Sequence, residues 1–268
     1  MKFIENEDDD IDKYQCKYEE IIGKGGYSKC YKVEKVKERK VYAGKVCSFT
    51  TKGVVKNIEN EIKIHSELDH KNIIKMEEVI RCKSKIFIIM ELAEKGNLIE
   101  YLKKEKRIEE GKCIKIMKEI FEGVKYLHDK FIIHRDLKLS NILLSENDDI
   151  KICDFGFSAN IQYPQQLKND LVGTPNYIAP EILKAQGHSF PADIWSCGVM
   201  FYTLLYGKAP FESQTVKETY INIKNLKYNF PSNISVSSDC KELISNILSL
   251  SPSDRPTINH ILAHKLFK

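Results

Sequence analysis

The sequence predicts an α+β fold of two lobes, in which a small β-rich lobe with one main helix is followed by a larger helical lobe. Short apolar runs separated by turn residues fill residues 18–92, whereas helical spacing dominates residues 93–268. A chain of 268 residues is also long enough for two lobes that each bury a core of their own.

Composition excludes several classes of protein. With 42% hydrophobic and 30% charged residues, the chain has the balance of an ordinary globular protein. The net charge of +4 is small and no block of Lys and Arg dominates, so nothing favours nucleic acid or a membrane as a partner. No apolar run approaches the length of a membrane-spanning helix.

The cysteines indicate the compartment. Eight of them are scattered without the close pairs of a metal site, and several lie in apolar runs, where a reduced thiol acts as a small hydrophobe. The first residues are acidic, unlike the basic start of a signal peptide. We therefore expect a cytoplasmic or nuclear protein.

The small lobe is expected to begin after an acidic flexible tail, residues 1–17, with strand-like runs from Tyr18 onward. Residues 23–28 form a glycine-rich turn whose backbone, free of side-chain bulk, can offer N–H groups to phosphates. A plain turn explains the glycines equally well on their own. Lys45, on the following strand, favours the phosphate-binding interpretation.

One helix is predicted in this lobe, from Val54 to Leu68, and it carries Glu61. Glu61 could equally be a solvated charge, and the neighbouring Glu59 competes for any role. Strands at residues 73–80 and 86–90 complete the lobe. Turn residues then indicate a linker over residues 91–97, with the lobe boundary between residues 92 and 93.

The larger lobe contains a polar loop, residues 133–141, between two apolar runs. Asp136 can accept a proton from an attacking hydroxyl, Lys138 can neutralise a transferring phosphoryl group, and Asn141 offers an oxygen to a hard cation. Asp154 follows the next apolar strand and is a second candidate ligand. These residue types together indicate a catalytic loop.

Two helices are predicted before this loop, at residues 98–103 and 112–128. A long polar segment leads from Asp154 to residues 173–181, and loops of that length are usually functional or mobile. Asp193 is predicted to cap the apolar helix that comes next.

Seven features follow one another in a fixed order: the glycine-rich turn, residues 43–45, Glu61, residues 134–136, Asn141, residues 154–156 and residues 179–181. This order resembles the protein kinase catalytic domain from end to end, over roughly residues 18–268. The resemblance implies the bilobal protein-kinase fold, with ATP and Mg²⁺ as cofactors.

The resemblance also implies an activity, the transfer of the ATP γ-phosphate to Ser or Thr of protein substrates. Lys45 is implied to hold the α- and β-phosphates and to pair with Glu61. Asp136 is implied to orient the substrate hydroxyl. Lys138 is similar to the lysine of Ser/Thr kinases in this loop, and Thr174 is implied to support Asp136 and Lys138.

Asn141 and Asp154 are the implied magnesium ligands. The nucleotide is implied to contact the glycine-rich turn and the sheet, with the backbone of the linker binding the adenine. The residues of this expected site are Ile22, Gly23, Lys24, Gly25, Gly26, Tyr27, Ser28, Cys30, Ala43, Lys45, the gatekeeper Met90, Glu91, Ala93 and Leu143.

Other matching residues are implied to be structural. Glu181 and Arg255 resemble the ion pair that stabilises the larger lobe, and Asp193 resembles a brace for the catalytic loop. His65 and His134 match positions that pack in a regulatory spine, so we expect them to be packing residues rather than acid-base groups.

Finer features resemble the polo-like kinases, because Ser28 replaces the third glycine of the turn and Cys30 replaces the usual valine. This implies a role in the cell cycle; Aurora-like or calmodulin-dependent kinases are the alternatives. Ser140 stands where many basophilic kinases have a glutamate, which argues against an arginine-directed substrate preference. An acidic preference upstream of the acceptor is what the resemblance to polo-like kinases implies. Polo kinases continue into a polo-box region, absent from this sequence, so we expect a longer full-length protein and a monomer for this part.

Asp170 occupies the position at which polo kinases carry an activating threonine. We hypothesise that Asp170 supplies a fixed negative charge to Arg135, which in this class of kinases contacts a phosphorylated activation loop. The alternative is an exposed aspartate without a partner.

Two other functions remain possible, a pseudokinase scaffold and a small-molecule kinase. A pseudokinase usually lacks one of the residues that correspond here to Lys45, Asp136, Asn141 and Asp154, and all four are present. A small-molecule kinase is disfavoured by the complete segment at residues 179–181 and the helices after it.

Overall fold

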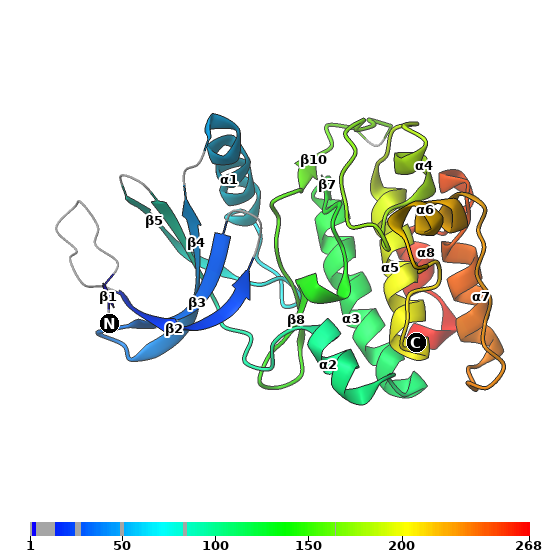
Figure 1. The fold of residues 1–268 in the computed structure, drawn as a ribbon, viewed down its shortest axis with the longest axis horizontal. Helices are drawn as coiled ribbons and strands as arrows, with labels where there is room; N and C mark the ends of the chain where they lie inside the picture. Colours follow the sequence, from blue (N-terminus) through cyan, green and yellow to red (C-terminus); the bar gives the residue numbers. More distant parts are fainter. Residues whose placement is uncertain (1, 4–13, 25–27, 49–50, 83–84, 164) are drawn as a thin grey trace.

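The chain folds into the two expected lobes, a β-rich lobe and a larger helical lobe (Figure 1). The computed structural model describes residues 2–3, 14–24, 28–48, 51–82, 85–163 and 165–268. The small lobe is an antiparallel sheet in the order β1–β2–β3–β4–β6–β5. Its strands are β1 (Lys2–Phe3), β2 (Tyr14–Lys24), β3 (Ser28–Lys35), β4 (Lys40–Ser48), β5 (Met76–Cys82) and β6 (Lys85–Met90).

The first long strand starts earlier than the sequence predicts. Strand β2 begins at Tyr14 rather than Tyr18, and Tyr14 pairs with Lys35 of β3. Lys2–Phe3 also pair with β2, so part of the expected tail belongs to the sheet. Apolar alternation missed this extension because a β-ladder is built from backbone groups that every non-proline residue carries. Residues 4–13 of the expected tail lie outside the described residues.

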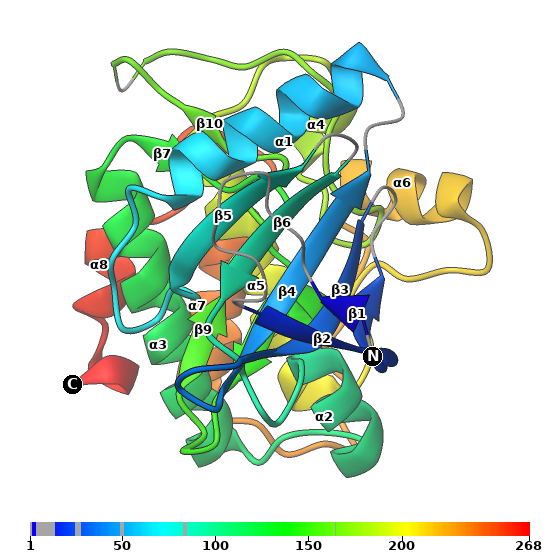
Figure 2. The ribbon, with the colours of Figure 1, turned by 90° about the vertical axis from the view of Figure 1, so that its left-hand side faces the viewer.

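Helix α1 (Lys52–His65) packs its apolar face on the sheet (Figure 2). The side chain of Thr51 accepts a hydrogen bond from the N–H of Val54 and caps the start of the helix. Ile58 and Ile62 are buried in the core, and the helix ends at His65, three residues before the predicted end. This packing turns Glu61 toward the sheet, where it too is buried.

The helical lobe is built around α5 (Phe190–Tyr206), whose residues from Ala192 to Tyr206 are all buried. The prediction that Asp193 caps this helix is wrong. The helix begins at Phe190 after the N-cap Ser189, because Pro191 favours the first turn of a helix, and Asp193 lies inside that turn. Its carboxylate is free to bind another segment for that reason.

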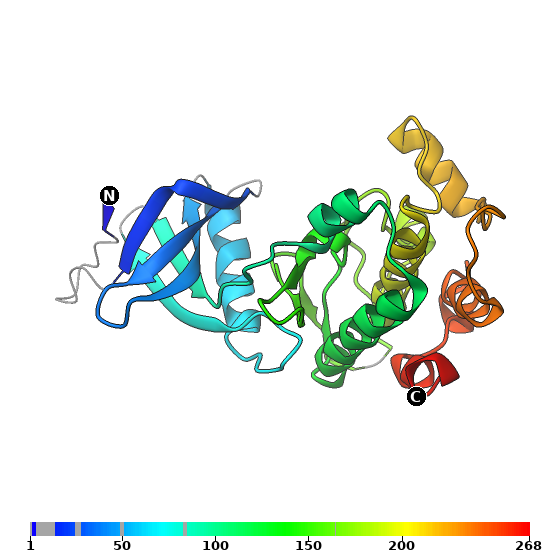
Figure 3. The same cartoon turned by 90° about the horizontal axis from the view of Figure 1, so that it is seen from below.

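Among the described residues, six further helices and two small two-stranded sheets complete this lobe, and α6 stands at its outer end (Figure 3). The helices are α2 (Leu98–Glu105), α3 (Glu110–Asp129), α4 (Pro180–Leu183), α6 (Val216–Lys224), α7 (Ser238–Ile247) and α8 (Ile258–Leu262). The two small sheets pair β7 (Ile132–Ile133) with β10 (Ala159–Asn160), and β8 (Ile142–Leu144) with β9 (Ile150–Ile152). The 3₁₀ turns are η1 (Leu139–Asn141), η2 (Pro252–Asp254) and η3 (Lys265–Phe267). Within the described residues, no helix is both long and apolar enough to cross a membrane.

The two lobes are joined by backbone pairing as well as by the linker. The predicted strand 73–80 actually begins at Met76, because the residues before it pair with β9 of the helical lobe. The N–H of Ile74 donates to the carbonyl of Ile152 at 2.9 Å, and the N–H of Ile152 donates to the carbonyl of Asn72 at 2.8 Å. The predicted strand is therefore divided: its first residues pair with β9 of the helical lobe, and its later residues form β5 of the small lobe.

A buried ion pair joins α4 to the end of the chain. Arg255 donates to the two carboxylate oxygens of Glu181 at 2.8 and 2.6 Å, and both side chains are buried. Arg255 also donates to the carbonyls of Pro191 and Ser249, and its guanidinium lies 5.1 Å from the ring centroid of Trp195. The expected pair is confirmed.

We predict that Arg255→Met lowers the free energy of unfolding by about 3–5 kcal/mol, because the buried Glu181 carboxylate loses its partner. Chemical denaturation of the purified protein measures the change. Lys103→Met breaks the exposed pair with Glu100 and is the control, expected to change stability by less than about 0.5 kcal/mol. Equal effects of the two substitutions would contradict the prediction.

Candidate active site

Lys45 on β4 lies at the centre of an ion cluster. Its Nζ is 2.5 Å from Oε1 of Glu61 on α1 and 3.1 Å from Oδ1 of Asp154. Burial tends to lower the pKa of Lys45, but the carboxylates of Glu61 and Asp154 outweigh it and raise that pKa above its usual value. Lys45 is therefore charged. The competing residue, Glu59, instead pairs with Arg81 at 2.9 Å.

Asp154 is held in place by the residue after it. Phe155 is fully buried and packs between the rings of His65 and His134, with centroid distances of 4.7 and 5.2 Å. The backbone of Asp154 is in the left-handed region, with φ of 69°. Burial tends to raise the pKa of Asp154, but Lys45 outweighs this effect and holds the pKa below its usual value. Asp154 is therefore a carboxylate.

Asp136, Lys138 and Thr174 form a closed triangle. Lys138 Nζ donates to Asp136 Oδ2 at 2.6 Å and to the Thr174 hydroxyl at 2.9 Å. The Thr174 hydroxyl donates to Asp136 Oδ1 at 2.7 Å. Each of the three side chains thus fixes the other two, and the contacts expected of Thr174 are present.

Asn141 ends the short turn η1 next to this triangle. Its Nδ2 donates to the Asp136 carbonyl at 2.9 Å, which orients the amide and leaves Oδ1 as the atom for a ligand. Carboxylate and amide oxygens suit Mg²⁺, which commonly takes its other ligands from water and phosphates. Among the described residues, no three His, Cys, Asp or Glu side chains gather to hold a metal alone. The oxygens of Asn141 and Asp154 fit an ion shared with a phosphate substrate.

Asp193, in the first turn of α5, braces the catalytic loop, as the resemblance implies. Its two carboxylate oxygens accept the N–H groups of His134 and Arg135, each at 2.9 Å. The Nε2–H of His128 donates to the same carboxylate at 3.0 Å. Burial tends to raise the pKa of Asp193, but the hydrogen bond from His128 contributes most to lowering it, and the net pKa is below its usual value.

His65 and His134 are packing residues. Burial lowers the pKa of His65 to about 4, and its Nε2–H donates to the carbonyl of Ile74 at 2.7 Å. His134 bonds the carbonyl of Cys153 through Nε2 at 3.1 Å and accepts the N–H of Asp136 through Nδ1 at 3.3 Å. Both rings therefore bind backbone rather than a substrate.

Several expected nucleotide contacts lie side by side on the sheet. Ala43 pairs with Met90 across β4 and β6, and Cys30 pairs with Lys45 across β3 and β4. Burial raises the pKa of Cys30 to about 11, so its thiol is protonated. Of the other expected contacts, Ser28 begins β3, whereas two further strands carry the rest of this group: Ile22, Gly23 and Lys24 end β2, and Leu143 lies on β8.

Gly25, Gly26 and Tyr27, at the tip of the glycine-rich turn, lie outside the described residues. In the linker, the N–H of Glu91 donates to the carbonyl of Lys75 at 3.0 Å, so only the carbonyl of Glu91 remains for a ligand. The carbonyl of Ala93 accepts the N–H of Gly96 at 3.3 Å, which leaves the Ala93 N–H as its group for a ligand.

Arg135 binds Asp170. Its Nη1 donates to both carboxylate oxygens of Asp170, at 2.7 and 2.6 Å, and its Nε donates to the carbonyl of Phe157 at 2.6 Å. Partial burial tends to raise the pKa of Asp170, but Arg135 outweighs it and lowers the pKa. The alternative of an aspartate without a partner is wrong.

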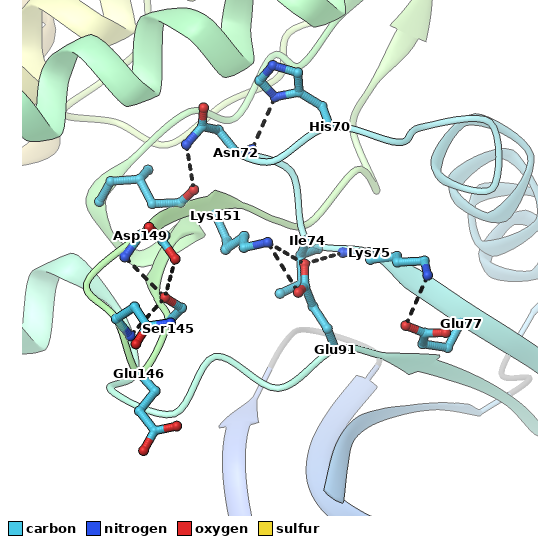
Figure 4. A network of polar contacts seen from close by, with 12 residues as sticks. His70, Asn72, Ile74, Lys75, Glu77, Glu91, Ser145, Glu146, Asp149 and Lys151 are labelled. Carbon is cyan, nitrogen blue, oxygen red and sulfur yellow. Dashed lines mark hydrogen bonds and ion pairs between the residues drawn. The ribbon is translucent and has the colours of Figure 1, made fainter. Parts of the chain in front are cut away.

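Sequence reasoning missed two sets of polar contacts near the site. One is the hydrogen bond from His128, the third donor to the Asp193 carboxylate. The other is the network around Glu91, in which its side chain meets Lys75 and Lys151 (Figure 4). No local signal marks these residues, because each contact joins segments that are distant along the chain.

Comparison with known proteins gives one family. The model of the protein kinase domain matches residues 16–267. The probable cell cycle serine/threonine-protein kinase CDC5 homolog of Encephalitozoon cuniculi is 42% identical over 261 residues, which are 94% of this chain and 55% of that protein. Serine/threonine-protein kinase polo of Drosophila melanogaster is 42% identical over 253 residues, 92% of this chain and 43% of that protein.

A plant protein is similar to the same degree. The probable serine/threonine-protein kinase CCRP1 of Zea mays is 42% identical over 252 residues, 92% of this chain and 40% of that protein. The chain thus spans between 40% and 55% of the length of these relatives. Because the family match runs from the first long strand to the last helical turn, the chain belongs to the protein kinase domain family.

Proposed function

We propose that this chain is a polo-like protein kinase that transfers the γ-phosphate of ATP to Ser or Thr of protein substrates. The observation that carries the proposal is the pair of clusters built around Lys45 and Asp136. One presents a charged lysine held between two carboxylates, and the other presents a carboxylate oriented by Lys138 and Thr174. Relatives named as Ser/Thr kinases support it.

Each residue has a role that its surroundings favour. Lys45 binds the α- and β-phosphates while Glu61 fixes its position. Asp136 accepts the hydrogen of the substrate hydroxyl, so that the oxygen is aimed at the γ-phosphorus as the bond to the ADP oxygen breaks. Lys138 lies beside that oxygen and offsets negative charge on the moving phosphoryl group. Mg²⁺ bound by Asn141 and Asp154 would neutralise further phosphate charge.

The test is phosphate transfer from ATP to casein. We expect activity in the wild type and a loss of at least about a hundredfold in Asp154→Asn, because a metal-binding charge is removed from the site. Asp148→Asn, in an exposed pair with Lys95, makes the same change elsewhere and should leave activity intact. A wild type that binds ATP without transferring phosphate would support the pseudokinase scaffold instead.

A second prediction concerns Thr174. Thr174→Ala removes the hydroxyl that bridges Asp136 and Lys138, and we expect kcat to fall about tenfold to a hundredfold because the carboxylate is no longer oriented. Thr174→Ser keeps the hydroxyl and should keep most of the activity. Steady-state kinetics with saturating ATP measure the change. Wild-type kcat in Thr174→Ala would show that the hydroxyl is not needed.

The cell-cycle role is part of the proposal and is supported by the names of the relatives, one of which is called a cell cycle kinase. A screen of peptides varied at each position around the acceptor tests the substrate class. An acidic preference upstream of the acceptor would agree with a polo-like kinase, whereas a strong requirement for upstream arginine would overturn the assignment. The cytoplasmic or nuclear location stays a prediction.

We further propose that Asp170 replaces a regulatory phosphate. The carboxylate binds Arg135, which also binds the backbone just after Gly156, so the pair links the catalytic loop to the segment that follows Asp154. An aspartate is ionised at neutral pH, and Arg135 stabilises this charge by lowering the pKa of Asp170 further. A carboxylate has fewer acceptor oxygens than a phosphate, and it requires no upstream kinase.

Accordingly, phosphatase treatment of the wild type should leave its activity unchanged. Asp170→Asn should lower activity by about tenfold, since the ion pair with Arg135 is lost. Kinase assays on the expressed protein, before and after phosphatase, measure both effects. Full activity in Asp170→Asn would rule out this role for Asp170.

A further inference from the structure

Glu91 is the first residue of the linker, and its side chain holds the linker between the lobes. Oε1 accepts the N–H of Lys75 at 2.7 Å, and Lys151 Nζ lies 3.0 Å from Oε1 and 3.2 Å from Oε2 (Figure 4). The N–H of Glu91 in turn donates to the carbonyl of Lys75 at 3.0 Å. Glu91 and Lys75 are therefore bound twice, once through each other's backbone and once through the carboxylate.

Both partners of Glu91 are themselves fixed. Lys75 follows Ile74, whose N–H donates to Ile152 of β9, and Lys151 is the residue just before Ile152. Ile150 and Ile152 are fully buried on one face of β9, so Lys151 lies on the opposite face. The carboxylate of Glu91 thus joins three segments that already pair with one another: the residues before β5, strand β9 and the linker.

Lys151 also lies beside the expected floor of the nucleotide site. It pairs with Leu143 in the register of β8 and β9, and Leu143 is one of the residues proposed to contact adenine. The ion pair is only partly exposed to water, with 16% of the Lys151 side chain and 30% of the Glu91 side chain accessible. Solvent therefore screens it less than a fully exposed pair.

We propose that Glu91 and Lys151 are positioning residues for the nucleotide, acting through the orientation of the Glu91 carbonyl. This inference rests on the proposed function, because it takes that carbonyl as an adenine acceptor. The two hydrogen bonds with Lys75 hold the N–H and the side chain of Glu91, and its carbonyl extends from the same Cα. Lys151 keeps the carboxylate in place for its bond to Lys75. A group fixed before binding loses less entropy when the ligand arrives, so the pair raises nucleotide affinity without touching the nucleotide.

The residues before β5 also provide a matched control. Lys71 pairs with Glu122 of α3 at 2.7 Å, which also ties the residues before β5 to the helical lobe through a lysine and a glutamate. This pair does not involve the linker. Lys71→Met therefore removes one positive charge and one link between the same two parts of the molecule, while leaving Glu91 bound.

The experiment measures the Kd for ADP by calorimetry, together with kcat and KM for ATP, in the wild type, Glu91→Gln, Lys151→Met, the double variant and Lys71→Met. We expect each of the two single variants at the linker to raise Kd about threefold to tenfold, because one charged hydrogen-bonding contact is lost. For Lys151→Met we expect kcat within about twofold of wild type, since the reacting groups are untouched.

Two further results are expected. The double variant should be no worse than the poorer single variant, because both substitutions break one unit. Lys151→Arg should restore most of the affinity, since it keeps a cation on β9. Should Glu91→Gln fail to fold, Lys151→Met decides the matter, because methionine keeps the apolar stem of the lysine.

Three outcomes would overturn the inference: a Kd for ADP unchanged in Lys151→Met, an equal rise in Lys71→Met, or a changed kcat at constant Kd. A wild type that neither binds nucleotide nor transfers phosphate would instead overturn the proposed function. The two failures are therefore distinguishable in one set of measurements.

Discussion

The ammonium of Lys45, on a side chain that is only 12% exposed, is the constraint on which the site depends. A buried charge needs partners, and Lys45 finds them on α1 and at the end of β9. Glu61 can reach it only when α1 is rotated so that Ile58 and Ile62 enter the core. Asp154 can reach it only when Phe155 fills the space between His65 and His134. The packing of the small lobe and the geometry of the site are therefore one arrangement.

The catalytic loop depends on a second buried charge, the carboxylate of Asp193. It satisfies the N–H groups of His134 and Arg135 at a point where the backbone of Arg135 has φ of 68°, a conformation unusual for a residue with a side chain. Because Asp193 fixes the backbone of Arg135, the guanidinium of Arg135 can extend to Asp170 and Phe157. Support of the loop and its link to the following segment thus pass through one residue.

The expected adenine-binding segment is held in the same manner. Glu91 is bound to the residues before β5 through Lys75 and to the helical lobe through Lys151. At Asp193 and at Glu91 a carboxylate receives two or more donors from segments that meet only in the folded chain. Such multiply bonded acceptors are stronger than isolated surface pairs, because little side-chain freedom remains to be lost.

The sequence alone determined the two lobes, the order of the kinase motifs and most of the residues that meet at the site. Residue type and local spacing decide these features: glycines for the turn, a carboxylate after an apolar strand for Asp154, and apolar periodicity for α1. Even the start of β2 escaped this reasoning, because backbone pairing leaves no mark in apolar spacing.

Tertiary structure decided which partner each charged residue takes. The sequence predicts that Asp193 caps a helix, yet its carboxylate binds backbone N–H groups 58 and 59 residues earlier in the chain. Asp170 found Arg135 across 35 residues, and Glu91 found Lys151 across 60. A carboxylate binds whichever donor the fold brings within about 3 Å, and that choice depends on packing far from its own position in the sequence.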